Sequence, residues 1–507
     1  MKRRAGTTLL LVLVSCGAKR EPPPRLVILY APCTVRCDFL GPYESTLAST
    51  PALATLARES VVFEKHVTEC AQSGVAYAAL FTGTQADRHG IAFHPSLLAA
   101  GNTTLAEVFA GAGYETWAWS GQPMASADLG YAQGIAPEHV RNHELRFQPE
   151  PQALAPGTLE HLAADDEDFR ALLAQLAADP AKRAYVQVSF TVSHEPYHQY
   201  VSREEIRAFR DAYPAEARGV TDAELDRWLP VYEEHRHRLN WDFPAAREEL
   251  ALTDGDVERL AAVLELVYAA CIHRLDGLVG DVLRAIDEAG LADETLFAFT
   301  ADHGEVLWRP DALFPWTHGM GLEPEELHVP WLLRAPGLAP RRYAGVTRSI
   351  DVFPTLLGLA GVAVPEGVQG TDLSDVLTGN AEPPRQLAFA HNSILGERRL
   401  KRFADMDVLR RAMPAADPTR LWTAVRSDEL FLRRRRLDPE PWRTEACEWT
   451  REQERELAPA DDATRAALAA ELERYQARLV EAQARAASTP LEESEELERL
   501  RALGYVR

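Results

Sequence analysis

Short apolar segments alternate with amphipathic segments along most of the chain, and this alternation predicts a parallel sheet with helices on both faces. We therefore expect one large α/β domain over residues 25–385. In chain order, the segments are strand 25–30, helix 50–60, strand 60–67, helix 104–113, strand 116–120, strand 184–192, helix 268–290, strand 295–300, strand 329–337 and helix 351–361.

Three regions depart from this alternation. Residues 199–266 are rich in charged, helix-favouring residues and predict a helical excursion that leads into the helix at 268–290. Residues 421–436 predict an antiparallel pair of strands, and residues 461–487 carry charged pairs at helical spacing. We expect a smaller C-terminal α+β subdomain, with a long helix, over residues 386–507.

The first 15 residues have the pattern of an export signal. Lys2, Arg3 and Arg4 precede a short apolar run, and "LVSC" ends at Cys16, as in a bacterial lipobox whose cysteine is lipidated. The alternative is an ordinary signal peptide with an incidental cysteine. Residues 16–24 are expected to form a proline-stiffened tether. The apolar run is too short to span a bilayer, so we expect membrane contact through a lipid anchor only, in the bacterial cell envelope, on the periplasmic or surface side of the outer membrane.

The net charge of −22 argues against nucleic acid as a partner, because such binding needs a basic surface. The one basic run, Arg433 to Arg436, is interpreted as a solvated strand or turn edge. The alternative interpretation is a patch that contacts phosphate or sulfate.

Candidate chemistry follows the predicted strands. Asp302 and His303 come directly after the strand at 295–300, and such a pair offers an oxygen and a nitrogen to one cation. His194, His318 and His89 could donate to an anionic oxygen or protonate a leaving group. Taken singly, each of these three histidines is more often structural.

In their order, these segments resemble the sulfatase family of the alkaline-phosphatase superfamily. The resemblance runs from about residue 25 to about residue 373, and its motifs are "TVRCDFLGPY", "TPALATLARESVVFEKHV", "ALFTGTQADRHG", "LVGDVLRAIDEAGLADETLFAFTADHGE", "EELHVPWLLRAPG" and "SIDVFPTLLGLAGVAVPEGVQGTDL". The resemblance implies an alkaline-phosphatase-like fold and hydrolysis of sulfate or phosphate esters of small molecules or glycans. It also implies one divalent cation, which is calcium in most sulfatases.

The resemblance also implies roles for single residues. Ser73 aligns with the nucleophile, and Asp302 and His303 align with a pair of metal ligands. His318 aligns with a histidine that binds the oxygens of the ester, and His194 with a histidine of a neighbouring loop.

Two positions depart from the family pattern near the nucleophile. Val75 and Tyr77 replace the proline and arginine of the motif that directs conversion of the nucleophile to formylglycine, so we expect Ser73 to remain serine. These departures leave two hypotheses for function: an ester hydrolase, or a catalytically inactive binding or scaffold lipoprotein.

A third departure is Cys33, which aligns with the family's first metal-binding aspartate, while Asp38 aligns with a later aspartate of the same motif. A thiolate is a soft ligand that calcium would not choose. Cys33 could bind a softer ion such as zinc together with Asp302 and His303. Alternatively, Cys33 forms a disulfide with Cys37 or Cys70, which leaves the metal site incomplete. We favour the disulfide.

Overall fold

The computed structural model describes residues 22–43, 50–92, 96–142, 166–215, 217–309, 312–392, 406–412, 421–436, 440–447 and 462–485. The predicted export signal and Cys16 lie outside these residues. Within the described part, no helix is both long enough and apolar enough to cross a membrane.

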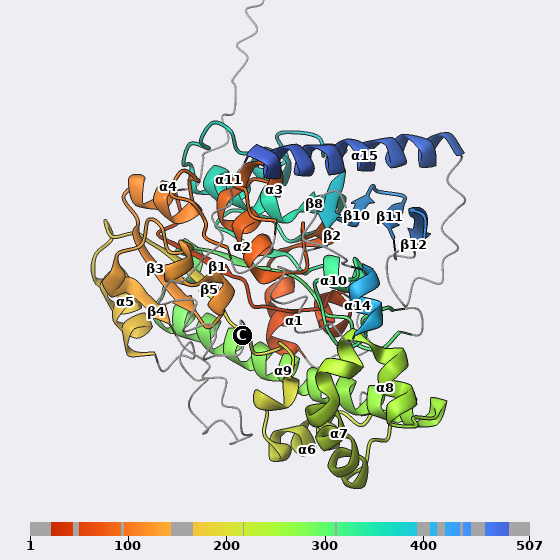
Figure 1. Ribbon diagram of the computed structural model, residues 1–507. Helices are drawn as coiled ribbons and strands as arrows, with labels where there is room; N and C mark the ends of the chain where they lie inside the picture. Colours follow the sequence, from red (N-terminus) through yellow and green to blue (C-terminus); the bar gives the residue numbers. More distant parts are fainter. Residues whose placement is uncertain are drawn as a thin grey trace, which may run out of the picture.

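A mostly parallel sheet of eight strands forms the centre of the molecule (Figure 1). Its central strand β1 pairs in parallel with β5 on one side and β6 on the other, whereas β7 runs antiparallel to both of its neighbours. The mixed α/β fold expected from the sequence is thus confirmed. In spatial order the strands are β4 (Val140–Asn142), β3 (Glu115–Ser120), β5 (Ala184–Ser189), β1 (Leu26–Tyr30), β6 (Thr295–Phe299), β7 (Leu332–Arg334), β2 (Val61–Val67) and β8 (Arg341–Arg348).

Helices cover both faces of this sheet, because both faces of its central strands are apolar. In β1, Leu26, Ile28 and Tyr30 join one buried cluster, and Val27 and Leu29 join the other. On the first face lie α1 (Pro51–Ala57), α5 (Glu167–Ala178), α6 (Arg203–Ala212), α7 (Asp222–Trp241) and α9 (Asp254–Glu288). On the second face lie α2 (Ser73–Thr82), α3 (Ala86–His89), α4 (Leu105–Gly111), α11 (Ser349–Ala360), α12 (Ser374–Leu377) and α15 (Asp462–Arg485).

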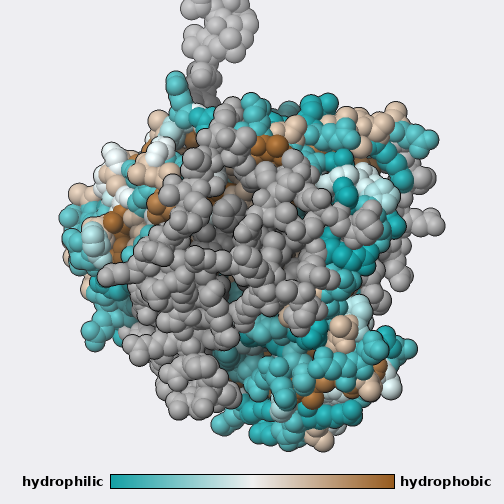
Figure 2. All heavy atoms as spheres, in the orientation of Figure 1, coloured by the Kyte–Doolittle hydropathy of each residue, from teal (hydrophilic) through white to brown (hydrophobic). Residues whose placement is uncertain are grey.

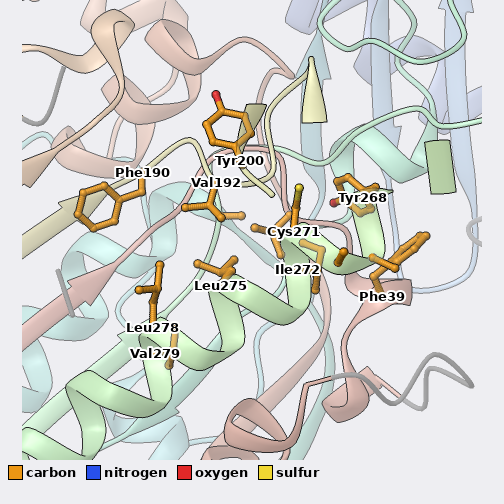
Figure 3. Close-up of a cluster of buried hydrophobic side chains, with 14 of the residues drawn as sticks. Phe39, Phe190, Val192, Tyr200, Tyr268, Cys271, Ile272, Leu275, Leu278 and Val279 are labelled. Carbon is orange, nitrogen blue, oxygen red and sulfur yellow. The ribbon is translucent and has the colours of Figure 1, made fainter. Parts of the chain in front are cut away.

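The long helix α9 anchors the first face. Figure 3 shows its Leu278 below Phe190 and its Leu275 below Val192, two side chains from the segment that follows β5. The helix begins at Asp254 rather than at residue 268, because Thr253 and Asp256 form a capping box that starts it earlier.

The predicted helical excursion before α9 consists of α6, α7 and α8 (Phe243–Glu249). Figure 2 shows a mainly hydrophilic outer surface over these helices, at the lower right of the view. Their inner faces contribute Trp228 and Tyr232 to the core. The excursion therefore packs on the body as an ordinary amphipathic layer.

A second, antiparallel sheet forms the C-terminal subdomain. Its strands lie in the order β12 (Arg443–Cys447), β11 (Phe431–Arg435), β10 (Thr423–Arg426) and β9 (Ala388–His391). Helix α15 contacts β10 and β11 and also α3 of the larger unit.

The basic run in β11 corrects one sequence-based interpretation. Arg433 is only 4% exposed and forms an ion pair with Glu323, which is also buried. Arg435 pairs with the same Glu323 at 3.6 Å and with Glu445 at 3.1 Å. The run is therefore not a simple solvated edge, because two of its arginines neutralise buried or half-buried acids.

Close backbone packing surrounds Gly304, the residue after His303. A Cβ atom at this position would lie 1.9 Å from the carbonyl oxygen of Glu325. The Gly304 N–H also donates to the Glu326 carbonyl at 2.7 Å. A side chain at position 304 would push the residues after β6 away from the backbone of Glu325 and Glu326.

We predict that Gly304→Ala lowers the free energy of unfolding by about 1–3 kcal/mol or more, because overpacking forces backbone shifts. The matched control is Gly277→Ala in α9, where an added Cβ meets nothing within 4 Å. That control should be neutral or stabilise the protein by up to about 1 kcal/mol. Thermal and urea unfolding measure both, and equal stability of the two variants would contradict the packing assignment.

Candidate active site

The carboxyl ends of three parallel strands bring most of the predicted chemistry to one edge of the sheet. Cys33 follows β1, Asp302 and His303 follow β6, and Gln122 follows β3. Ser73 is the first residue of α2 and is 2% exposed. This edge is where open α/β sheets place their sites.

Cys33, Asp302 and His303 each direct one metal-ligating atom toward a common point. These three atoms lie within 4.8 Å of one another, and all three residues are buried. Cys33 Sγ is 3.8 Å from His303 Nε2, and His303 Nε2 is 3.4 Å from Asp302 Oδ2. The structure thus brings together Asp302, His303 and Cys33, the set that the sequence analysis gave as the alternative to a Cys33 disulfide.

Backbone groups hold the Asp302 and His303 side chains by one atom each, so that the other ligand atom of each lies within the group. Asp302 Oδ1 accepts from the backbone N–H of Thr34 at 3.1 Å and of His303 at 2.7 Å. Asp302 Oδ2 is buried without a hydrogen-bond partner. His303 Nδ1–H donates to the Gly304 carbonyl at 2.9 Å, so Nε2 carries the free lone pair.

The electrostatics of this group also suit a cation. Burial lowers the pKa of His303 to about 3, so its imidazole is neutral and able to act as a ligand. Burial and the negative charge of Asp302 raise the pKa of the Cys33 thiol well above its usual range. A buried carboxylate oxygen without a partner is costly, and a divalent cation would offset this cost. The residues present therefore fit a divalent metal ion.

Ser73 lies beside the metal group and is hydrogen-bonded on two sides. Its Oγ is 3.2 Å from His303 Nε2 and 3.4 Å from Cys33 Sγ. Gln122 Nε2 donates to Ser73 Oγ at 3.0 Å and to Cys33 Sγ at 3.2 Å. Met124 N–H donates to Gln122 Oε1 at 3.1 Å, which fixes the direction of the amide.

Gln122 is a site residue that sequence reasoning missed. It stands in "SGQPM", directly after β3, and a single glutamine after a strand has no distinctive motif. The available signal was its position, since a polar side chain at the carboxyl end of a parallel strand lies at the active edge.

His194 and His318 lie close to His303. The ring centroids of His318 and His303 are 4.4 Å apart, and those of His318 and His194 are 4.8 Å apart. His318 Nδ1 is 3.2 Å from both carboxyl oxygens of Glu305. The structure therefore gathers three of the four candidate histidines.

Two acids lie near these histidines, the buried Glu305 and the half-buried Glu195, and their pKa values shift in opposite directions. Burial and the charge of Glu195 raise the pKa of Glu305 well above its usual range. Burial also acts to raise the pKa of Glu195, but Arg236 and the neighbouring histidines outweigh it and lower that pKa. Such a pair of carboxyl groups allows one to hold a proton while the other stays charged.

The fourth candidate, His89, belongs to a different buried cluster. Its Nε2 is 3.6 Å from Glu69 Oε2, and Glu69 also accepts from the Tyr475 hydroxyl of α15 at 2.9 Å. This cluster ties the C-terminal helix to the segment before α2. His89 therefore has the structural role that a lone histidine usually has.

The expected disulfide is not present. Cys33, Cys37 and Cys70 are all free buried thiols, as is Cys271. The disulfide interpretation is therefore wrong, and the physical reason is that Cys33 Sγ faces Ser73, Gln122 and His303 across the site.

The aligned positions of the family motif are filled by packing residues. Val75 and Tyr77 are fully buried, and the Tyr77 hydroxyl donates to the Ala31 carbonyl at 2.7 Å. Asp38 forms an ion pair with Arg36, so its carboxylate is engaged away from the metal group.

With the fold and the site established, the chain can be placed among known proteins. Residues 34–362, more than half of the chain, match the family model described as Sulfatase. The chain belongs to the sulfatase family, and its fold is that of the alkaline-phosphatase superfamily.

Two curated relatives illustrate the range of sequence similarity. A multifunctional alkaline phosphatase superfamily protein from Trinickia caryophylli is 25% identical over 395 residues, which cover 68% of this chain and 73% of that protein. A choline-sulfatase from Rhizobium meliloti is 27% identical over 246 residues, covering 48% of this chain and 42% of that protein.

Solved structures show the same fold over nearly the whole chain. The phosphonate monoester hydrolase of Agrobacterium radiobacter has a TM-score of 0.59 at 20% identity, covering 91% of this chain and 96% of that one. A second protein, solved in complex with its substrate D-glucosamine-2-N,6-O-disulfate, has a TM-score of 0.60 at 16% identity. The match covers 93% of this chain and all of that chain.

We predict that Cys33, Cys37 and Cys70 are all alkylated by iodoacetamide after denaturation without reductant, because none is oxidised. In the native, metal-free protein the same thiols should react slowly, because they are buried and burial raises the pKa of each thiol. Peptide mass spectrometry identifies the modified residues. Cysteines that become alkylated only after reduction would contradict the free-thiol assignment.

Proposed function

We propose that this protein hydrolyses sulfate or phosphonate esters, with the unmodified hydroxyl of Ser73 as the nucleophile. The observation that carries this proposal is the placement of Ser73 Oγ within hydrogen-bond distance of Gln122 and His303, next to three candidate metal ligands. Family membership and the substrates named for related proteins support the same reaction class.

Cys33, Asp302 and His303 would hold the divalent cation. When bound, such a cation supplies Lewis-acid polarisation of the ester oxygens and stabilises negative charge close to Ser73. The side chains of the site must therefore orient the hydroxyl, bind the remaining ester oxygens and transfer a proton.

Gln122 orients the nucleophile. Its Nε2 donates to Ser73 Oγ, so the Ser73 hydroxyl hydrogen points away from Gln122 and a lone pair faces the amide. The rigid start of α2 holds the hydroxyl in place at the end of the sheet. Such preorganisation lowers the entropic cost of reaching the transition state.

In this proposal His318 and His194 act on the leaving oxygen, and the support is that their rings lie beside His303. The Glu305 carboxyl group lies 3.2 Å from His318 Nδ1 and so orients the imidazole ring. Burial and the charge of Glu195 raise the pKa of Glu305, which favours a proton held on this carboxyl group beside His318. Protonation of a leaving alkoxide is the general-acid role that this arrangement supports.

A second candidate function is a catalytically inactive member of the family that acts as a binding or scaffold lipoprotein. The observation in its favour is Tyr77, which occupies the position of the motif arginine and is bonded into the core. Activity measurements distinguish the two functions.

We predict that Ser73→Ala and Asp302→Asn each lower kcat/KM by about 10³-fold or more, because these groups act as one unit. The matched control is Ser60→Ala, a buried serine whose hydroxyl donates to the Leu56 carbonyl away from the site. Aryl sulfates, phosphate monoesters, phosphonate monoesters and phosphodiesters serve as substrates, with calcium, magnesium, manganese or zinc supplied. Absence of turnover of every substrate, or full activity of Ser73→Ala, would overturn the proposal.

We further propose that the mature protein is attached to the cell envelope through lipidated Cys16. The basis is the N-terminal charge pattern, the short apolar run and the residues "LVSC" before a proline-rich tether. The substrate would then be an ester that reaches the outer compartments of the cell.

Cys16→Ser should move the full-length protein from the detergent phase to the aqueous phase in a phase-separation assay, because a lipid chain supplies the membrane affinity. Mass spectrometry of the wild-type N-terminal peptide checks for the lipid. Recovery of both proteins in the same phase would contradict the anchor.

A further inference from the structure

The metal group of this protein has an unusual set of donor atoms for an ion of the calcium type. Calcium takes six to eight oxygen ligands, including several carboxylates or carbonyls. Here the three candidate ligands offer one sulfur, one nitrogen and one uncommitted carboxylate oxygen. The second carboxylate oxygen, Asp302 Oδ1, already accepts two backbone N–H groups.

We propose that Cys33 makes this site selective for zinc, or for a similar borderline-soft ion, over calcium. The proposal rests on the metal group of the proposed function and specifies the ion it takes. Cysteine sulfur, histidine nitrogen and aspartate oxygen are the three donor types that zinc binds in proteins.

Two separations between the donor atoms are close to those around a four-coordinate ion. Ligands of a tetrahedral zinc at about 2.0–2.3 Å lie about 3.3–3.7 Å from one another. Cys33 Sγ and His303 Nε2 are 3.8 Å apart, and His303 Nε2 and Asp302 Oδ2 are 3.4 Å apart. Ser73 Oγ is 3.4 Å from the sulfur and 3.2 Å from the same nitrogen, and so lies directly beside the three candidate ligands.

Each ligand also has the outer partner that metal sites use to fix their ligands. His303 donates its other ring N–H to a backbone carbonyl, which sets its orientation. The Gln122 amide donates to Cys33 Sγ, an interaction that stabilises negative charge on sulfur. Because these hydrogen bonds hold the His303 nitrogen and the Cys33 sulfur in position, they favour an ion that binds nitrogen and sulfur, such as zinc.

Charge balance favours a bound dication. On binding, the Cys33 S–H bond breaks, its proton passes to solvent and the thiolate sulfur bonds to the metal. The thiolate and the Asp302 carboxylate together carry two negative charges, which neutralise a dication inside a buried site. Three protein ligands with a fourth position near the nucleophile is the pattern of catalytic rather than structural zinc.

The test is metal binding by the full mature chain after removal of metal with a chelator. Competition with a chromophoric zinc chelator and calorimetry with Zn²⁺ and Ca²⁺ measure the two affinities, and Co²⁺ reports the ligands. We expect zinc to bind at least about 100-fold more tightly than calcium. We also expect a sulfur-to-cobalt charge-transfer band in the near ultraviolet.

Matched cysteine variants identify the ligand. Cys33→Ala should lower zinc affinity by at least about 100-fold and remove the cobalt band, whereas Cys271→Ala, at a buried cysteine of α9, should leave both unchanged. Cys33→Asp should shift the preference toward calcium, because it replaces sulfur by carboxylate oxygen. Circular dichroism verifies that each variant folds, and the wild-type cobalt spectrum decides the matter if Cys33→Ala does not fold.

Wild-type protein that binds calcium as tightly as zinc, or that binds cobalt without a sulfur band, would overturn the inference. These readouts do not depend on turnover. Zinc binding through Cys33 without ester hydrolysis would refute the proposed function alone. Hydrolysis supported by calcium and retained in Cys33→Ala would refute the zinc assignment alone.

Discussion

The site depends on one constraint: polar and ionisable side chains are buried together at the carboxyl edge of the central sheet, where water cannot satisfy them. Burial of a charged or polar group without a partner is costly, so each such group needs a fixed neighbour. Asp302 has one oxygen bonded to two backbone N–H groups and the other without a partner. That asymmetry directs the free oxygen toward Cys33 and His303, and it defines where an ion would sit.

The C-terminal subdomain is connected to this edge by a second buried polar system. Glu323, only 1% exposed, pairs with Arg433 of β11. Glu326 lies three residues further on, and its carboxylate accepts a hydrogen bond at 2.7 Å from the N–H of Gly319, the residue after His318. The backbone carbonyl of Glu326 accepts a second hydrogen bond from the Gly304 N–H. Residues 323–326 therefore connect the smaller sheet to the loop of Gly304 and to the loop of Gly319, which follows His318. The C-terminal subdomain therefore helps to fix the positions of the loops that carry Gly304 and His318.

Much of this arrangement could be predicted from the sequence because its signals are local. Strands buried on both faces are continuous apolar runs, as in "LVILY" and "TLFAF", and the residues after them lie at the active edge. The roles that the resemblance implied for Ser73, Asp302 and His303 needed only the family's order of motifs. The disulfide prediction was wrong because sequence spacing gives no direction for a side chain, and Cys33 points into the site. The prediction of a solvated basic run was wrong because Arg433 acquires its buried partner from a loop 110 residues away.

The sequence by itself determined the α/β fold, the family and the identity of most groups at the edge of the sheet, because these follow from periodicity and from motifs in order. Only the tertiary structure decided how those groups face one another. It placed Gln122 between Cys33 and Ser73, left one oxygen of Asp302 without a partner and paired His318 with Glu305. These are contacts between residues far apart in the chain, and they are set by the packing of whole strands and helices. Local sequence patterns carry no record of that packing.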